Sequence, residues 1–521
     1  MKKALKPSDD RASPPALGGD ALSSETLGNG HARGWYRSSA VTDNVDTPPA
    51  GMPVRHTWAE SERFVPRTIV QPMNRLFAHE AAGGIVMLIS ALFAIGWANS
   101  PWSDSYFDLW NTHIVVEVGS VLHLDHLTLQ AWVNDALMTA FFLLVGVEIK
   151  REVIHGHLRE VRTIALPVLA AIGGMVVPAL IYRALNSGGA GSDGWAIPMA
   201  TDIAFAVGIV TLAGKRVPLP AKVFLLTLAV ADDIGAIVVI ALFYAGSLSV
   251  GWLFSAAAAL VVIFLMRRND VQSLAPYLAT GAFLWLALLE SGVHATLAGV
   301  ALGLLTPAWP LRSPIRFPSE SRRVIADIER AFYDRVLTGE EFAENEQRIA
   351  EVSRLAMLST SPMERLERAL TPWVTYVIVP VFALANAGVS LSRDTLGGLL
   401  DDRITVGVVL GLVLGKAVGV LAGAGIGVGL RIGQLPPGVG WRHMVGVATV
   451  AGVGFTVSLF VASLSFDDVA SSDAAKVGIL AGSAIAGLVG YLILRLGPGP
   501  MQTYADGLHG PRGSGDRGSV S

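Results

Sequence analysis

Five charged side chains lie inside apolar stretches of the sequence that are long enough to cross a lipid bilayer. They are Asp135, Asp202, Asp232, Asp233 and Lys416. A charged side chain at mid-bilayer costs at least about 2.5–3.5 kcal/mol on insertion scales. These charges must therefore meet one another, water or an ion, and in membrane proteins such residues commonly mark the path of an ion or a proton.

The adjacent residues Asp232 and Asp233 lie in the run LAVADDIGAIVVIALF (228–243). Neighbouring residues of a helix point about 100° apart around its axis, so the two carboxylates cannot address one point. We expect one carboxylate to pair with a cation from another helix and the other to face an aqueous cavity. Lys416 is the basic residue available for this pairing, because it is the only one in the middle of an apolar span.

The segment that carries Asp202, GWAIPMATDIAFAVGIV (194–210), contains a helix-breaking proline. Pro198 lacks a backbone donor, and Thr201 and Asp202 follow it closely. A second segment, VGVATVAGVGFTVSLF (445–460), carries Gly452 and Gly454 at its middle. In membrane transporters, spans interrupted by proline or glycine in both halves of the chain point to a binding site at the bilayer midplane.

These residues could together form a site made of oxygen atoms. The carboxylates of Asp202 and Asp233, the hydroxyl of Thr201 and the carbonyls freed by the helix breaks suit hard cations rather than soft transition metals. Burial and nearby like charges both disfavour a bare carboxylate, so such a group takes up either a proton or a cation. We predict that a proton and a hard cation compete for this site, which is sufficient for exchange.

The composition indicates that the elements around these residues lie in lipid. Of the 521 residues, 52% are hydrophobic and 16% are charged, whereas soluble domains carry roughly 25% charged residues. The sequence contains no cysteine, which excludes disulfides and thiolate chemistry. We predict an all-α membrane protein with twelve transmembrane helices. These lie near residues 81–100, 131–147, 163–185, 195–213, 221–246, 250–266, 274–290, 293–306, 373–391, 404–427, 444–465 and 475–495.

Lysine and arginine gather in alternate loops between these spans. The positive-inside rule places those loops, and with them both termini, in the cytoplasm. Residues 1–66 and 498–521 are predicted to be disordered cytoplasmic tails, because they have too little apolar surface to offset the entropy of ordering. The membrane domain is then 67–497, and its loop 307–371 is predicted to be an amphipathic cytoplasmic segment.

Residues 114–124, IVVEVGSVLHL, alternate strand-forming residues around a Gly-Ser turn signal. This pattern predicts a β-hairpin. An isolated hairpin is only marginally stable in water, and its edges are able to pair with another chain. Two interpretations stay open: the hairpin joins two copies of the protein in a homodimer, or it is an ordinary surface hairpin.

Seven longer strings resemble the NhaA-type sodium/proton antiporter family. They are FFLLVGVEIKRE (141–152), ATDIAFAVG (200–208), LAVADDIGAIVVIALFY (228–244), SGVHATLAGV (291–300), FALANAGVSL (382–391), GLVLGKAVG (411–419) and GVGFTVSLFVASLSF (452–466). The likeness extends in order from about residue 75 to 495 and excludes only the loop 307–360.

The resemblance implies a twelve-helix fold with inverted repeats, in which the spans near 195–213 and 444–465 are unwound and cross. It also implies a small extracellular β-hairpin that joins two subunits. In this family pattern Asp233 is the main carrier of cation and proton, and Asp232 pairs with Lys416. Thr201 and Asp202 lie beside the crossing.

The activity implied by the resemblance is exchange of cytoplasmic Na⁺ or Li⁺ for external H⁺ across a bacterial inner membrane. More protons than cations move, so the membrane potential drives the exchange. A funnel that contains Glu148, Arg151, Glu152 and Glu367 is implied to carry the response to pH. We expect a secondary transporter rather than an enzyme, with no cofactor and no nucleic-acid partner.

Two other classes of protein fit parts of the pattern. Intramembrane aspartyl proteases also use two buried aspartates, but their Tyr-Asp and Gly-x-Gly-Asp motifs occur here only at 333–334 and 513–516, outside the apolar spans. A cation channel would line an open pore with carbonyls or carboxylates, and a lysine at mid-depth would oppose cation flow. A Na⁺ flux that needs or makes a proton gradient distinguishes the antiporter from the channel.

Overall fold

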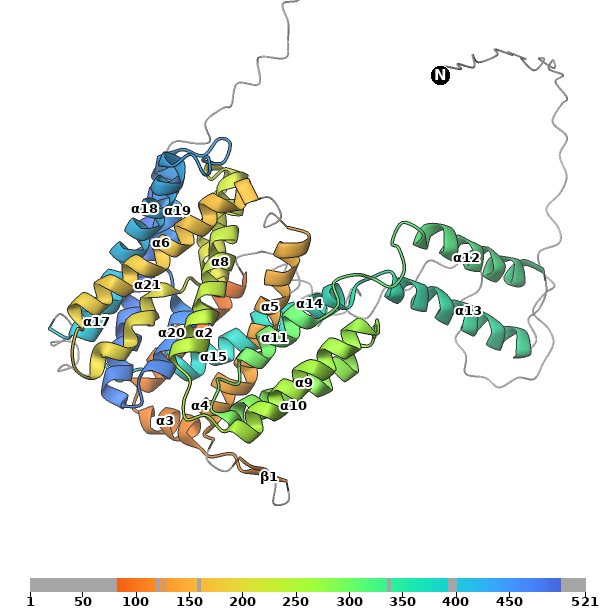
Figure 1. Ribbon diagram of the computed structural model, residues 1–521, viewed down its shortest axis with the longest axis horizontal. Coiled ribbons are helices and arrows are strands. Elements are labelled where there is room, and N and C mark those ends of the chain that lie inside the picture. Colours follow the sequence, from red (N-terminus) through yellow and green to blue (C-terminus); the bar gives the residue numbers. More distant parts are fainter. Residues whose placement is uncertain are drawn as a thin grey trace, which may run out of the picture. The chain divides into compact units, whose positions relative to one another are not determined.

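The computed structural model describes residues 82–118, 122–124, 127–156, 161–334, 339–391 and 401–497 of the chain. These parts are almost entirely helical, as Figure 1 shows. The predicted tails, 1–66 and 498–521, lie outside the described residues, and so do the turn residues 119–121 of the predicted hairpin.

The first half of the chain contains, in order, α2 (Ala82–Ala98), α3 (Ser103–Asn111), β1 (Val116–Val118), β2 (Leu122–Leu124), α4 (Leu129–Trp132), η3 (Val133–Leu137), α5 (Met138–Ile154), α6 (Val161–Leu185), η5 (Ala190–Met199), α7 (Ile203–Leu212), η6 (Gly214–Arg216) and α8 (Leu219–Phe243). The second half contains α9 (Val250–Arg268), α10 (Leu274–Ser291), α11 (Leu297–Leu305), α12 (Phe317–Asp334), α13 (Gly339–Leu358), α14 (Pro362–Trp373), η7 (Val374–Ile378), α15 (Val379–Asn386), α17 (Arg403–Leu410), η8 (Gly411–Gly415), α18 (Lys416–Gly429), α19 (Trp441–Val450), α20 (Phe455–Ser465) and α21 (Val469–Leu496). The η elements are 3₁₀- or π-helical turns.

Among the described residues, eight helices are long and apolar enough to cross a membrane, and three bent helix pairs bring the number to eleven if each pair is one span. The chain is therefore a multi-pass membrane protein, while the number of twelve spans stays a prediction. The stretch 293–306 contains only the 9-residue helix α11. At about 1.5 Å per residue, α11 is too short to cross a hydrocarbon core of about 30 Å alone.

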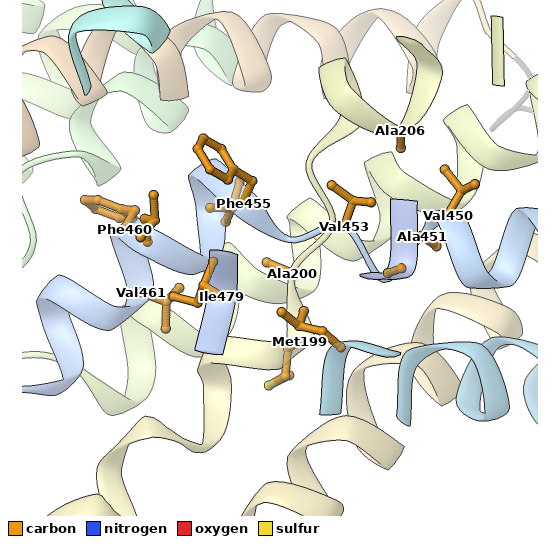
Figure 2. Packing of buried hydrophobic residues seen from close by; sticks show 14 of the residues in the cluster. Met199, Ala200, Ala206, Val450, Ala451, Val453, Phe455, Phe460, Val461 and Ile479 are labelled. Atoms are coloured by element: carbon orange, nitrogen blue, oxygen red, sulfur yellow. The ribbon is translucent and has the colours of Figure 1, made fainter. Parts of the chain in front are cut away.

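Two of the bent pairs are interrupted in the middle. The chain bends by 45° between η5 and α7 and by 45° between α19 and α20. The interruptions lie against each other: Figure 2 shows Met199 and Ala200 beside Ala451 and Val453. The Asp202 backbone N–H donates to the Val453 carbonyl over 2.7 Å. This bond satisfies one of the backbone groups that the helix breaks leave free.

Glycine permits this close approach. A Cβ atom added to Gly454 would lie 2.9 Å from the carbonyl oxygen of Ala200 and 2.1 Å from the hydroxyl of Ser458. Any larger residue at position 454 would therefore push the two interrupted segments apart. The Ser458 hydroxyl donates to the Ile197 carbonyl over 2.7 Å, which adds a second link between the segments.

Close packing of α6 against α18 positions the helix that carries the aspartates. A Cβ atom on Gly173 would lie 2.1 Å from the carbonyl oxygen of Gly419, and one on Gly419 would lie 2.1 Å from that of Gly173. Small residues allow helix backbones to approach in membranes, where lipid supplies no hydrophobic drive for association. Helix α8 packs on α6 in turn, so Lys416 on α18 can reach Asp232 on α8.

Helix α5 lies between two groups of buried apolar residues. Phe142 and Leu144 belong to a large cluster shared with η5, α7, α8 and α17 to α21. Leu143 and Val147 belong to a second cluster, which is built from α9, α10, α11 and α14. The end of α5 that carries Glu148 is therefore held at the boundary between the two clusters.

The remaining elements are short or charged. β1 pairs antiparallel with β2, in the register Val116 to Leu124 and Val118 to Leu122. Helices α12 and α13 pack against each other. Both helices are rich in charged residues, and the amphipathic cytoplasmic character of loop 307–371 stays a prediction.

Candidate functional site

Asp232 and Lys416 form a buried ion pair. Their Oδ2 and Nζ atoms are 2.6 Å apart, and both side chains are fully buried. The Lys416 ammonium also donates to the Met199 carbonyl at the end of η5. A carbonyl at a helix C-terminus carries partial negative charge, so one lysine compensates both the carboxylate and the helix end.

Asp233, the next residue, faces a different environment. It lines a cavity of about 240 Å³ together with Asp202, Thr201, Glu148 and Thr456. No basic side chain lines this cavity. Three carboxyl groups, those of Glu148, Asp202 and Asp233, line it. A cavity with several acidic oxygens and no lining cation is suited to hold a small cation or protons.

The rest of the cavity wall is mostly apolar and comes from α2, α5, α8, the two interrupted spans and the α14–η7–α15 segment. These residues are Gly83, Met87, Phe141, Leu144, Val145, Ile203, Ala204, Val207, Leu226, Thr371, Val374, Thr375, Val379 and Val457. An apolar wall strengthens every electrostatic interaction inside the cavity, because little solvent screens it.

Asp202 holds the starts of two helices at once. Its Oδ1 accepts a bond of 3.0 Å from the backbone N–H of Phe205 and so caps α7. Its Oδ2 accepts from the hydroxyl of Thr456 over 2.6 Å and from the Thr456 backbone N–H over 3.2 Å, at the start of α20. A carboxylate is favourable at a helix N-terminus, and here one carboxylate serves two.

Thr201 links the interrupted spans from the other side. It is fully buried, and its hydroxyl donates to the Ala451 carbonyl over 2.8 Å. The hydroxyl oxygen keeps acceptor lone pairs, and the residue lines the cavity beside Asp202 and Asp233. Thr201 can therefore supply an oxygen ligand without losing its structural bond.

The four predicted funnel residues divide into two groups. Glu148 lines the same cavity as Asp233. Arg151 and Glu367 form an ion pair between α5 and α14, with side chains 48% and 18% exposed. Glu152 is half-buried near the end of α5 and does not line the cavity. The structure thus brings Glu148 to the carboxylates and leaves the other three nearer the helix ends.

The sequence reasoning did not identify Thr456. Its hydroxyl is within hydrogen-bonding distance of Asp202, although the two residues are 254 positions apart. A signal was present, because Thr456 follows the Gly452–Gly454 interruption as Thr201 follows Pro198. A hydroxyl placed just after a helix break is a candidate ligand or helix cap.

The polar side chains that line the cavity offer only oxygen atoms as ligands. In the described parts of the chain, no group of three or more His, Asp or Glu side chains is arranged to hold a metal ion. A cation in the Asp233 cavity would rely on carboxylates, hydroxyls and backbone carbonyls. Oxygen-only coordination of this kind suits hard cations.

Comparison with known proteins now identifies the family. Residues 74–494 match the family described as Na⁺/H⁺ antiporter 1. The chain belongs to this family. It is 45% identical over 455 residues to Na(+)/H(+) antiporter NhaA 2 of Sorangium cellulosum, which covers 87% of this chain and 95% of that protein.

Two further relatives show the same extent of similarity. Na(+)/H(+) antiporter NhaA of Oleidesulfovibrio alaskensis is 44% identical over 82% of this chain and 94% of its own length. The NhaA protein of Helicobacter pylori is 42% identical over 81% of this chain and 94% of its own length. The similarity therefore covers nearly the whole of each relative, and the family match over residues 74–494 includes every segment that forms the cavity.

Proposed function

We propose that this protein is a secondary transporter that exchanges Na⁺ or Li⁺ for H⁺ at Asp233. The observation that carries the proposal is the contrast around residues 232 and 233. Asp232 is neutralised by Lys416, whereas Asp233 opens on an acidic cavity that no basic side chain lines. Membership of the Na⁺/H⁺ antiporter 1 family supports the same activity.

The exchange follows from competition for one carboxylate. When Asp233 binds a cation, the charge of the cation stabilises the ionised carboxylate and the proton leaves. When the proton returns, the neutral carboxyl group no longer attracts the cation, which then dissociates. Asp202, Thr201 and backbone carbonyls of the interrupted spans would complete the oxygen shell of the bound ion. Binding of the two substrates is thereby mutually exclusive.

We further propose that Glu148, Arg151, Glu152 and Glu367 set the response to pH. Support comes from the position of Glu148, which lines the same cavity as Asp233. Protonation of Glu148 would remove a negative charge from the cavity and weaken its attraction for a cation. The Arg151–Glu367 ion pair connects α5 with α14, and both helices contribute residues to the cavity wall. Loss of this ion pair could therefore shift the wall of the cavity.

We place the protein in a bacterial inner membrane with both termini in the cytoplasm, on the basis of its apolar helices and basic loops. An electrogenic exchange would require more protons than cations per cycle, and three acidic residues line the cavity to carry them. We also propose that 114–124 joins two copies into a homodimer, since each outer edge of the β1–β2 pair is able to accept another strand.

The test is proton flux in proteoliposomes that contain the purified full-length protein. Added Na⁺ or Li⁺ should drive proton movement across a series of pH values, and K⁺ should not. Net flux should stop when the proton gradient and the membrane potential together balance the cation gradient. A Na⁺ flux that moves no protons would instead identify a channel and would overturn the proposal.

A further inference from the structure

A groove of about 780 Å³ lies apart from the Asp233 cavity, where three spans meet the edge of the membrane. It is lined by the start of α6, the start of α8 and the loop that follows α18. The candidate spans that form it begin at Ile164 and Leu219 and end at Gly429. Because span ends lie at the level of the lipid headgroups, the groove opens where headgroups are found.

The lining of the groove is apolar along its length and basic at one place. Leu166, Leu219, Val223 and Phe224 supply the apolar wall, and Arg431 is the one charged residue among the lining residues. The polar groups beside it are the Gln434 amide and the Thr227 hydroxyl, which already donates to a carbonyl of its own helix. A wall of this kind fits an acyl chain, with an anionic group held at the arginine.

The charge of the surrounding segments also favours an anionic group at Arg431. The sequence contains no Asp or Glu from 203 to 231 or from 403 to 466. Among the described residues, Arg431 has no acidic partner. Lys222 and Arg442 belong to the same segments, and these two segments contribute no carboxylate to offset their positive charge. An anionic ligand would meet no repulsion from these two segments.

The backbone at Arg431 gives an independent reason to look for a ligand. Its φ angle is 57°, in the left-handed region. The Arg431 and Ile432 backbone N–H groups bond the carbonyls of Val428 and Gly427, each over 3.0 Å, which closes α18 in a Schellman motif. Glycine is the usual residue at this position. An arginine in this left-handed conformation lowers the stability of the fold relative to glycine. Backbone strain of this kind is commonly kept at sites that have a function.

We propose that this groove binds an anionic phospholipid. The guanidinium of Arg431 would hold the phosphate through charge-assisted hydrogen bonds. One acyl chain would lie along Leu219, Val223 and Phe224. The lipid would then fasten the loop 430–437 to the starts of α6 and α8, and this role is separate from cation exchange at Asp233.

The left-handed backbone supplies a sharp test. Arg431→Gly removes the guanidinium and places glycine where the backbone favours it, so the variant should fold and melt no lower than the wild type in detergent alone. Phosphatidylglycerol should raise the melting temperature of the wild type more than phosphatidylcholine does. We expect Arg431→Gly to lose this extra rise in melting temperature. In native mass spectra, its affinity for phosphatidylglycerol should be lower by a factor of roughly ten or more.

Three controls separate the groove from general surface charge and from binding of a free anion. Arg442→Gln removes a positive charge from the same end of the protein without touching the groove, and it should keep the full effect of phosphatidylglycerol. Val223→Trp fills the apolar wall and should reduce the effect while Arg431 remains. Inorganic phosphate alone, at the same concentration, should not stabilise the wild type.

Three results would overturn the proposal. The first is an undiminished phosphatidylglycerol effect in Arg431→Gly. The second is an equal loss in Arg442→Gln, which would show attraction by diffuse charge only. The third is full stabilisation by inorganic phosphate, which would identify a free anion rather than a lipid as the ligand.

Discussion

Asp232 and Asp233 are adjacent in α8, yet the two sides of the helix on which they lie have opposite properties. The Asp232 side is closed, and its carboxylate is bonded to Lys416 within a fully buried pair. The Asp233 side opens on a cavity lined by acidic and hydroxyl groups. One helical step of about 100° separates them. The fold thus gives the buried carboxylate on one side of the helix a basic partner, whereas no basic side chain lines the cavity on the other side.

The largest expected effect comes from the open side. Asp233→Asn should reduce Na⁺-dependent proton flux in proteoliposomes below detection, because an amide carries no charge and takes up no proton. The melting temperature should be unchanged or higher, since a buried charge without a basic partner is removed. Asp473→Asn is the matched control: this residue pairs with Lys476 on α21, does not line the cavity, and should leave the flux unchanged. Exchange at the wild-type rate in Asp233→Asn would exclude Asp233 from the site.

Substitutions in the Asp232–Lys416 pair should change the stability of the protein. Lys416→Ala leaves the Asp232 carboxylate buried without its partner, which we expect to lower the free energy of unfolding by about 3–5 kcal/mol. Asp202→Asn should cost less, since its single amide oxygen can keep the bonds to one helix start, so that only the bonds to the other helix start are lost. The double variant Asp232→Leu with Lys416→Met should recover most of the loss, because a well-packed apolar pair can replace a buried ion pair. Equal melting curves for Lys416→Ala and Asp202→Asn would contradict the pairing.

A smaller effect is expected in the wall of the Asp233 cavity, where the Thr456 hydroxyl bonds Asp202. Thr456→Val removes the donor of the 2.6 Å bond and should cost about 1–3 kcal/mol. The Na⁺ concentration for half-maximal flux should rise, because Asp202 is less well positioned. Thr449→Val is the control, since the Thr449 hydroxyl bonds only a carbonyl of its own helix. If both variants raise the required Na⁺ concentration equally, Thr456 has no special role at the cavity.

The smallest change in stability is expected at the Arg151–Glu367 pair. The arginine is 48% exposed, so solvent screens the interaction, and Arg151→Gln should alter the free energy of unfolding by less than about 1 kcal/mol. The pH profile of the flux should nevertheless shift in this variant and in Glu367→Gln. Identical pH profiles in the wild type and both variants would remove the pair from the regulation and leave Glu148 and Glu152 as the remaining candidates.

Much of the architecture could be predicted from sequence, because charge and helix-breaking residues are conspicuous in apolar segments. The pairing of Asp232 with Lys416 followed from the presence of a single mid-span lysine. The interruption at Pro198 followed from its missing N–H group. The structure of the stretch 293–306 did not follow: Gly292 ends α10 with φ 80°, and the helix resumes only at Leu297, which an uninterrupted apolar pattern does not reveal.

The composition of the site was harder to predict than its existence. Thr456 contacts Asp202 only because two interrupted spans lie against each other, and nothing local to either segment specifies that register. The resemblance implied a funnel that contains Glu148, but it did not indicate that Glu148 lines the same cavity as Asp233. Its position depends on how α5 is held between two apolar clusters, and this is a property of tertiary packing.

The most direct test of the central claim is the number of protons released when Na⁺ binds. Isothermal titration calorimetry of the purified protein with Na⁺ measures this number when it is repeated in buffers of different ionisation enthalpy and at several pH values. At a pH where the Asp233 carboxyl group is protonated, we predict release of protons on Na⁺ binding in the wild type and no binding in Asp233→Asn. Na⁺ binding without proton release at every pH would contradict competition at Asp233.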